Sequence, residues 1–180
     1  MKVTTTAIAG LLVIEPKLLG DARGFFYESF NQKRFHESTG LDVNFVQDNQ
    51  SRSARRVLRG LHYQLQQPQG KLVRVVRGAV FDVALDLRKH SSTFGQWAGF
   101  ELTEDNHRQV WLPPGFAHGF MVISDSADLL YKTTNYYEPE SERCIAWNDP
   151  KLAIPWPLNA DPILSPKDQM GLMLHDAELD

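Results

Sequence analysis

The chain is poor in cysteine, in net charge and in long apolar runs. Cys144 is the only cysteine among 180 residues, so no intrachain disulfide can form, which fits a reducing compartment. The formal net charge of −3 argues against general binding to nucleic acid, so any affinity for phosphate must come from a local cluster. The polar opening segment 1–6 and the lack of a long apolar stretch predict neither a signal peptide nor a membrane span. We therefore expect a cytoplasmic globular protein that binds neither nucleic acid nor membranes.

Repeats and linkers are absent as well, so residues 1–180 are predicted to form one domain. The dominant pattern is a series of short β-type runs separated by turn residues. In residues 81–88, apolar side chains alternate with Asp82, Ala84 and Asp86, which predicts a strand with one apolar face. Similar runs occupy residues 72–76, 97–102, 109–112, 119–123 and 128–133. So many short strands predict a mainly β sandwich, jelly roll or small barrel.

Two short helices complete the predicted fold, one in the N-terminal third and one near the C-terminus. Residues 32–39 follow Asn31, a favoured N-cap, and precede Gly40, a favoured helix terminator. Residues 165–168 (SPKD) combine a capping serine with proline at the first helical position. Asp168 then falls where a capping box with Ser165 needs a carboxylate, and that structural role is its default interpretation.

The segment 58–64 (LRGLHYQ), with Lys71 shortly after it, is the richest in chemistry. Strict strand alternation would place Arg59 and His62 on opposite faces, unless Gly60 introduces a bulge or allows a ligand to approach closely. Histidine titrates near neutral pH, so His62 beside two cations suits an anionic substrate that must lose a proton. A buried, hydrogen-bonded core histidine is the alternative interpretation.

Residues 113–118 (PPGFAH) match the second half-signature of the cupins, β-barrel proteins in which such a histidine often binds a metal. The first half-signature requires His-x-His, whereas this chain has His62 followed by Gln64. A cupin metal site usually needs three nitrogen donors and a carboxylate, and this set is incomplete. We therefore expect a cupin-type fold with no metal and no cofactor.

Tyrosines and arginines supply further candidates. Residues 131–137 (YKTTNYY) hold three tyrosines, which could pack in a half-buried strand, donate a proton or stack on a base. The run 52–56 contains three arginines, and a solvated loop is the expected setting for them. Arg23 lies next to aromatic residues in segment 21–26 (DARGFF), near a predicted turn.

Taken together, these segments resemble the dTDP-4-dehydrorhamnose 3,5-epimerase family over essentially the whole chain. The matching segments are 15–17 (EPK), 21–26 (DARGFF), 45–49 (FVQDN), 58–62 (LRGLH), 70–74 (GKLVR), 94–97 (FGQW), 114–120 (PGFAHGF), 131–137 (YKTTNYY), 147–149 (WND) and 165–168 (SPKD). Many matches in the same order are far more specific than any single motif. The resemblance implies a cupin-type jelly roll and an isomerase that inverts C3 and C5 of a dTDP-linked 4-keto-6-deoxyhexose.

The resemblance also implies roles for individual residues. His62 would be the base, oriented by Asp168, with Asp82 and Asp86 as rival partners; Tyr131 would donate a proton, and Lys71 would stabilise an oxyanion. The implied substrate-binding residues are Arg23, Phe25, Glu28, Gln47, Asn49, Arg59, His118, Tyr136, Glu142 and Lys167. The segment 23–28 would serve the site of a partner subunit, which implies a homodimer.

Other functions remain open at this point. Related epimerases invert only C3, and related ketoisomerases share much of the framework, although Tyr131 argues against a ketoisomerase. A metal-dependent cupin is disfavoured by Gln64. A non-catalytic cupin that only binds a sugar nucleotide is disfavoured because His62 and Tyr131 serve chemistry better than affinity.

Overall fold

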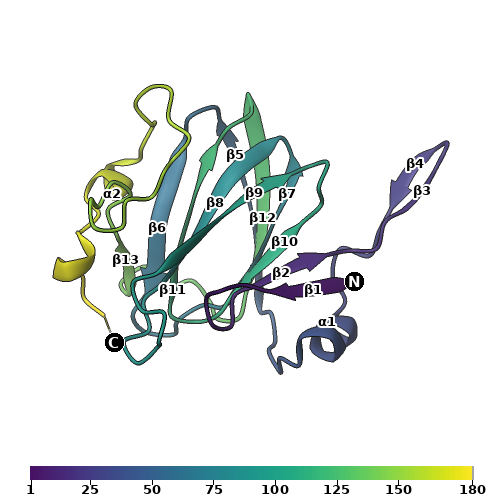
Figure 1. The fold of residues 1–180 in the computed structure, drawn as a ribbon, viewed down its shortest axis with the longest axis horizontal. Coiled ribbons are helices and arrows are strands. Elements are labelled where there is room, and N and C mark those ends of the chain that lie inside the picture. Colours follow the sequence, from purple (N-terminus) through teal and green to yellow (C-terminus); the bar gives the residue numbers. More distant parts are fainter. Residues whose placement is uncertain (180) are drawn as a thin grey trace.

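The computed structural model describes residues 1–179 and consists mainly of two antiparallel sheets (Figure 1). The first sheet has the strand order β1 (Lys2–Thr5), β2 (Leu12–Glu15), β10 (Gln109–Leu112), β7 (Lys71–Arg77), β12 (Ser126–Thr133) and β5 (Gln47–Ala54). The second sheet has the order β13 (Glu142–Cys144), β6 (Leu58–Gln64), β11 (Phe116–Val122), β8 (Ala79–Asp86) and β9 (Trp97–Thr103). The mainly β prediction is confirmed.

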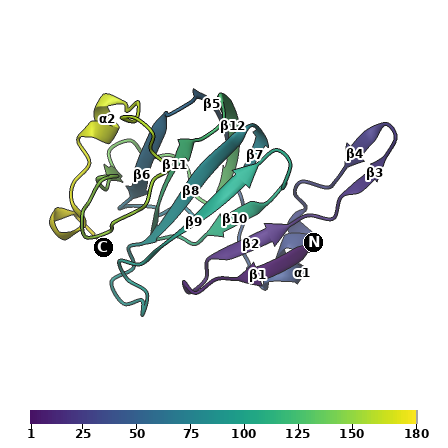
Figure 2. The same ribbon diagram turned by 45° about the horizontal axis from the view of Figure 1, so that its top comes forward.

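Shorter elements sit around this sandwich. The hairpin β3 (Leu19–Asp21) and β4 (Gly24–Phe26) projects away from the two sheets (Figures 1 and 2). Helix α1 (Gln32–Thr39) begins after Asn31, whose side chain accepts the Arg34 N–H, and ends at Gly40 in the left-handed conformation. Near the C-terminus lie α2 (Pro166–Gln169) and the 3₁₀ helix η1 (Leu174–Asp176). Both predicted helices are confirmed. No helix within residues 1–179 has the length and apolarity needed to cross a membrane.

Apolar side chains fill the space between the sheets. Val73 and Leu129 of the first sheet belong to one buried cluster with Val80, Ala84 and Phe120 of the second. This cluster is the main core, and it closes one part of the sandwich while polar side chains line another part.

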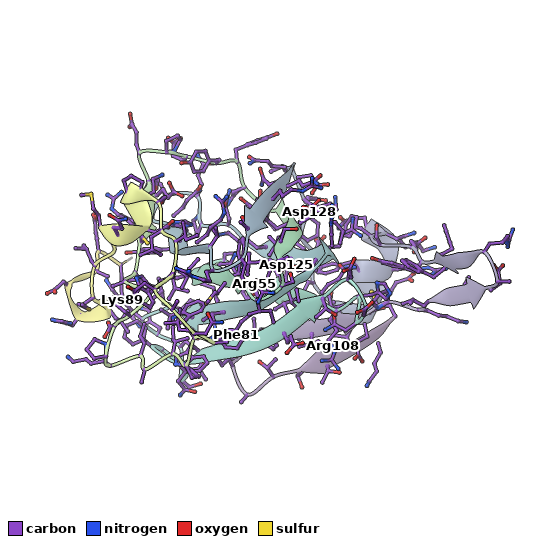
Figure 3. The ribbon with its side chains drawn as sticks, turned by 90° about the horizontal axis from the view of Figure 1, so that it is seen from above. Arg55, Phe81, Lys89, Arg108, Asp125 and Asp128 are labelled. Carbon is purple, nitrogen blue, oxygen red and sulfur yellow. The ribbon has the colours of Figure 1, made fainter. Side chains whose placement is uncertain are left out.

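The outer face of the second sheet is buried as well. Val83 and Leu85 pack there with Leu152 and Trp156 from the C-terminal segment. That segment runs along the sheet, and Figure 3 shows Lys89 beside its end, where Nζ donates to the Leu179 carbonyl at 2.8 Å. The predicted apolar face of residues 81–87 is present and packs in this cluster. The opposite face, with Asp82, Ala84 and Asp86, is buried as well, so strand β8 is buried on both faces.

Strand β6 contains a bulge at Gly60, one of the possibilities that this glycine raised in the sequence. The register with β11 shifts between His118 and Phe120, and Gly60 adopts φ +104° with its Cα so close to β11 that a Cβ would lie 2.5 Å from the His118 carbonyl. Only glycine fits such an approach. The extra residue shifts the alternation of side chains along β6, so Arg59 and His62 line the same cavity. Leu61 packs in the apolar cluster on the outer face of the sheet.

The loop predicted for residues 52–56 is only partly correct. Arg52 lies in β5 and forms an ion pair with Asp128 of β12, with Nε 2.6 Å from Oδ1. The turn after β5 holds Arg55, which faces Asp125 at 2.8 Å (Figure 3). Strand β5 is polar at almost every position, so no hydrophobic alternation marks it in the sequence.

Candidate active site

A cavity of about 330 Å³ lies between the two sheets and gathers most of the predicted site residues. The first sheet contributes Gln47, Asn49, Ser51, Lys71 and Tyr131, and the second contributes Arg59, His62, Gln64, His118 and Glu142. The two groups therefore form opposite walls. A ligand in this cavity would have a histidine on one side and a tyrosine on the other.

His62 stands on the second-sheet wall with a carboxylate beneath it. Its Nε2 lies 2.6 Å from Asp168 Oδ1, an ion-pair contact that lacks the N–H alignment of a hydrogen bond. The Asp168 carboxylate is only 3% exposed, and it also accepts the Gly60 N–H at 3.0 Å and the Ser165 hydroxyl at 2.6 Å. Burial alone would raise the pKa of Asp168, but the contacts with His62, Ser165 and Gly60 lower it to about 2. Asp168 is therefore an anion fixed against one edge of the imidazole.

Asp168 takes part in two sets of contacts, one with Ser165 and one with His62. The Ser165 hydroxyl oxygen accepts the Asp168 N–H at 3.2 Å, so the predicted serine cap of α2 is present. The carboxylate contacts the Ser165 side chain through Oδ2 and His62 through Oδ1. Helix capping and the contact with His62 coexist.

Lys71 and Tyr131 stand on the opposite wall. Strand β7 pairs with β12, and both side chains point into the cavity. Burial lowers the pKa of Lys71 to about 8, against the opposing effects of Glu142 and Asp82. Burial raises the pKa of Tyr131, and the negative charge of Glu142 raises it further. At neutral pH the wall thus offers an ammonium and a protonated phenol.

The two rival carboxylates have other partners. Asp82 is fully buried and places Oδ2 at 2.8 Å from Nε2 of His118. Asp86 accepts hydrogen bonds from Arg88 and Thr93, each at 2.7 Å. Neither of them is paired with His62 in the structure, so geometry favours Asp168 as the residue that orients it.

A polar group closes one side of the cavity. Glu142 forms an ion pair with Lys167 and accepts the Tyr137 hydroxyl at 2.8 Å. Burial acts to raise the pKa of Glu142, but Lys167 and Tyr137 lower it overall. Lys167 thus reaches the site through Glu142 and is not itself part of the cavity wall.

Besides Lys167, four predicted binding residues lie outside the cavity. Arg23 has a side chain that is 90% exposed and pairs with Asp21, and Phe25 is 62% exposed with its ring 4.7 Å from that of His107. Glu28 borders a second cavity of about 300 Å³ at the base of the hairpin. Tyr136 is 64% exposed. The chain by itself does not bring these residues to His62.

Several residues of the cavity wall were missed by the sequence analysis. They are Ser51, Tyr63, Gln64, Gln69, Gly119, Phe120 and Tyr137. Tyr137 directly follows Tyr136 in the tyrosine-rich segment 131–137. That segment was the sequence signal that could have identified Tyr137 as a cavity residue. Gln69 lies in a loop without pattern and reaches the cavity because Nε2 donates to the Asn135 carbonyl at 3.0 Å. No sequence signal marks that contact.

The side chains at the usual cupin metal position do not suit a metal. Gln64 stands where a ligand histidine would be, and its amide donates to the carbonyls of Gln67 at 3.0 Å and Tyr136 at 3.3 Å. His118 directs Nε2 at Asp82. The Gln64 amide is thus hydrogen-bonded to backbone carbonyls. The three nitrogen donors of a usual cupin metal site are not available at this position.

Comparisons with known proteins agree with this geometry. The family model described as dTDP-4-dehydrorhamnose 3,5-epimerase matches residues 5–176. The dTDP-4-dehydrorhamnose 3,5-epimerase of Pseudomonas aeruginosa is 59% identical over 178 residues, which cover 99% of this chain and 98% of that protein. The Escherichia coli protein of the same name is 56% identical over 170 residues, covering 94% and 92% of the two chains.

A solved structure shows the same fold. It is the dTDP-6-deoxy-D-glucose-3,5-epimerase of Legionella pneumophila in complex with dTDP-4-keto-L-rhamnose, with a TM-score of 0.96 and 56% identity. The alignment covers 98% of this chain and 94% of that one. The cupin-type fold and the family predicted from the sequence are both confirmed. The chain belongs to the dTDP-4-dehydrorhamnose 3,5-epimerase family.

Proposed function

We propose that the protein converts dTDP-4-dehydro-6-deoxy-D-glucose to dTDP-4-dehydro-L-rhamnose by inverting C3 and C5, a step of dTDP-L-rhamnose biosynthesis. One observation carries the proposal: His62 and Tyr131 face a single cavity from opposite sheets. Each proton removed flanks the C4 ketone, so its loss gives an enolate. Inversion then requires a base on one face of the sugar and a proton donor on the other.

The wall residues divide the chemistry between them. His62 removes the proton as the base, and Asp168 is a positioning residue that holds the imidazole and stabilises its charged form. Lys71 stabilises the negative charge that develops on O4. Tyr131 returns a proton from the opposite face. Groups of this kind typically contribute about 10²–10⁴-fold each to the rate.

The remaining predicted residues bind the substrate. Arg59 suits the diphosphate or the sugar, because its planar guanidinium matches anionic oxygens. His118 contacts the sugar, and Gln47 and Asn49 contact the nucleotide. Glu142 and Lys167 border the ligand as an ion pair. The Legionella relative in complex with dTDP-4-keto-L-rhamnose supports a dTDP-sugar as the ligand.

A homodimer of single-domain subunits completes the proposal, in a cytoplasmic location. Arg23 and Phe25 lie on the β3–β4 hairpin and Glu28 follows it, and this hairpin projects from the two sheets (Figure 2), which supports its contact with a second subunit. We assign Arg23 and Glu28 to polar contacts in the partner's site. Phe25 and Tyr136 would then enclose the thymine ring between two aromatic faces.

Product formation tests this function directly. The purified protein is incubated with dTDP-4-dehydro-6-deoxy-D-glucose, a dTDP-4-dehydrorhamnose reductase and its reduced nicotinamide cofactor. We expect dTDP-L-rhamnose, identified by NMR, with wild-type protein and none with His62→Ala. A product inverted at C3 alone would identify a single-site epimerase, and binding of dTDP without any product would identify a binding protein. Either of these results would refute the double inversion.

A further inference from the structure

A second group of potential ligand atoms lies beside His62. A ring nitrogen of His62, the sulfur of Cys144 and a carboxylate oxygen of Asp168 all lie within 4.8 Å of one another. Nitrogen, thiolate sulfur and carboxylate oxygen are the donors that Zn²⁺ takes in proteins, and three protein donors plus one open position form a common arrangement. This group is separate from the cupin metal position, which would use residue 64.

The backbone holds these donors in place. Cys144 of β13 is paired with His62 of β6 in the antiparallel ladder, so their side chains are neighbours across two strands. The Cys144 carbonyl accepts the Leu172 N–H at 2.9 Å, which fixes β13 from its other side. Two of the three donors therefore come from a regular, hydrogen-bonded part of the sheet.

Asp168 and His62 are also prepared as ligands. Gly60 and Ser165 already orient the Asp168 carboxylate through hydrogen bonds of 3.0 and 2.6 Å, as outer-shell groups do at metal sites. His62 Nε2 is buried and has no aligned hydrogen-bond partner among the described residues. A cation between this nitrogen, Oδ1 and the sulfur would satisfy all three.

Charge favours a cation at this position. Burial, together with the negative charges of Asp168 and Glu142, raises the pKa of the Cys144 thiol to about 12. The same negative surroundings attract a cation, and coordination by a metal ion deprotonates a thiol outright, with the proton passing to solvent. A thiolate and a carboxylate then balance the two positive charges of the ion.

We propose that His62, Cys144 and Asp168 form an inhibitory site for a thiophilic divalent cation such as Zn²⁺. Tetrahedral bonds of about 2.0–2.3 Å place ligand atoms about 3.3–3.8 Å apart, so the 2.6 Å contact between His62 and Asp168 must open by roughly 1 Å. A bound ion takes the Nε2 lone pair, so the single proton of the neutral ring must sit on Nδ1, the nitrogen that would otherwise accept the substrate proton. The inhibition rests on the proposed role of His62 as the base, whereas the binding does not.

Binding is tested with Cd²⁺ alone, because cadmium thiolates absorb in the ultraviolet. Cys144 is the only cysteine, so any such band reports this sulfur. We expect a charge-transfer band that saturates at one Cd²⁺ per chain in wild type and is absent in Cys144→Ser. In His62→Ala the affinity read from the band should fall roughly tenfold or more, because one ligand is lost. No band in wild type, or unchanged affinity in His62→Ala, would overturn the site.

Inhibition is measured separately with Zn²⁺. Cys144→Ser should have activity close to wild type in metal-free buffer, because the thiol makes only a 3.5 Å contact with the Ile145 carbonyl. We expect Zn²⁺ to inhibit wild type reversibly on chelation, and Cys144→Ser to need roughly tenfold more Zn²⁺. Equal inhibition of both proteins would overturn the proposal. If the band forms but the metal-free protein does not turn over substrate, the proposed function fails while the cation site stands.

Discussion

At the residue scale, burial shifts the pKa values of two groups on one cavity wall in opposite directions. The pKa of Lys71 falls to about 8, while the pKa of Tyr131 rises, because in each case burial disfavours the charged form. Lys71 thus titrates at about pH 8, and the Tyr131 phenol, whose pKa is raised from 10.0, stays protonated at that pH. The opposite wall presents His62 against a buried anion, Asp168. These differences give each group a distinct task and a distinct experimental signature.

Replacing Tyr131 with phenylalanine separates the two halves of the reaction. The variant loses only the hydroxyl, so His62 can still remove a proton and exchange it with solvent. We expect inversion to fall by about 10²–10⁴-fold while exchange with solvent deuterium persists. Proton NMR in D₂O follows both processes in one sample. Equal loss of exchange and inversion would show that Tyr131 is not merely the final proton donor.

The lowered pKa of Lys71 predicts how activity declines at alkaline pH. The ammonium is charged below about pH 8 and neutral above it, so oxyanion stabilisation is lost as the pH rises through that value. Since the pKa of Tyr131 is raised, the phenol cannot cause this decline. We expect kcat/KM of wild type to fall above about pH 8. Lys71→Met should be less active throughout and lack this decline; the same decline in the variant would contradict the assignment.

At the element scale, a bulge and a hairpin decide what reaches the cavity. The bulge at Gly60 turns Arg59 and His62 toward the same space. The β3–β4 hairpin carries Arg23 and Phe25 away from that space (Figure 1). The bulge thus assembles the site within one subunit, and the hairpin is available to a second subunit.

Mixed dimers test the role of the hairpin. His62→Ala removes the base, and Arg23→Ala removes the guanidinium that we assign to the partner's site. In the proposed homodimer, co-expression of the two variants would give mixed dimers in which one site has neither lesion and the other has both. We expect the mixed dimers to regain activity that neither variant has alone. Activity no higher than that of the separate variants would contradict a site shared between subunits.

The sequence predicts some of these elements well and others not at all. Helix α1 was predicted to the residue, because Asn31 and Gly40 are local signals that act through the backbone of the same helix. Strand β5 was missed, because its side chains are polar and its position depends on pairing with β12, far along the chain. The contact of Asp168 with His62 also spans distant segments, and only the family resemblance indicated it.

At the scale of the whole molecule, the two sheets are closed by one shared core and by the C-terminal segment on the outer face. Asp82 and Asp86 are buried on the opposite, inward face of β8, the face that carries Val80 and Ala84 of the core, and the alternating pattern of β8 did not reveal this burial. Asp86 is stabilised as an anion by Arg88, Ser91 and Thr93, and Asp168 by the contacts of the site. These buried carboxylates link the stability of the fold to pH.

Acid should therefore destabilise the protein in a defined range. The pKa values of Asp86 and Asp168 are both lowered from 3.8 to about 2, so their stabilisation is complete above about pH 4 and is lost as the pH falls through about 2. Each carboxylate contributes roughly 2 kcal/mol to the free energy of unfolding. Urea denaturation at a fixed protein concentration measures this, with Asp86→Asn as the comparison because Asp86 lies outside the cavity.

Asp86→Asn should be less stable than wild type at neutral pH and should lose less stability on acidification. The amide cannot ionise, so the contribution of residue 86 to the pH dependence of the free energy of unfolding disappears. The same loss of stability on acidification in both proteins would contradict the role of Asp86.

The central claim is that one cavity exchanges the protons at both C3 and C5, with His62 as the base. Proton NMR of dTDP-4-dehydro-6-deoxy-D-glucose with the protein in D₂O, without added metal or cofactor, tests it most directly. We predict deuterium at both carbons with wild type and at neither carbon with His62→Ala, while binding of dTDP to the variant is retained. Label at C3 alone, or at neither carbon with wild type, would contradict the claim.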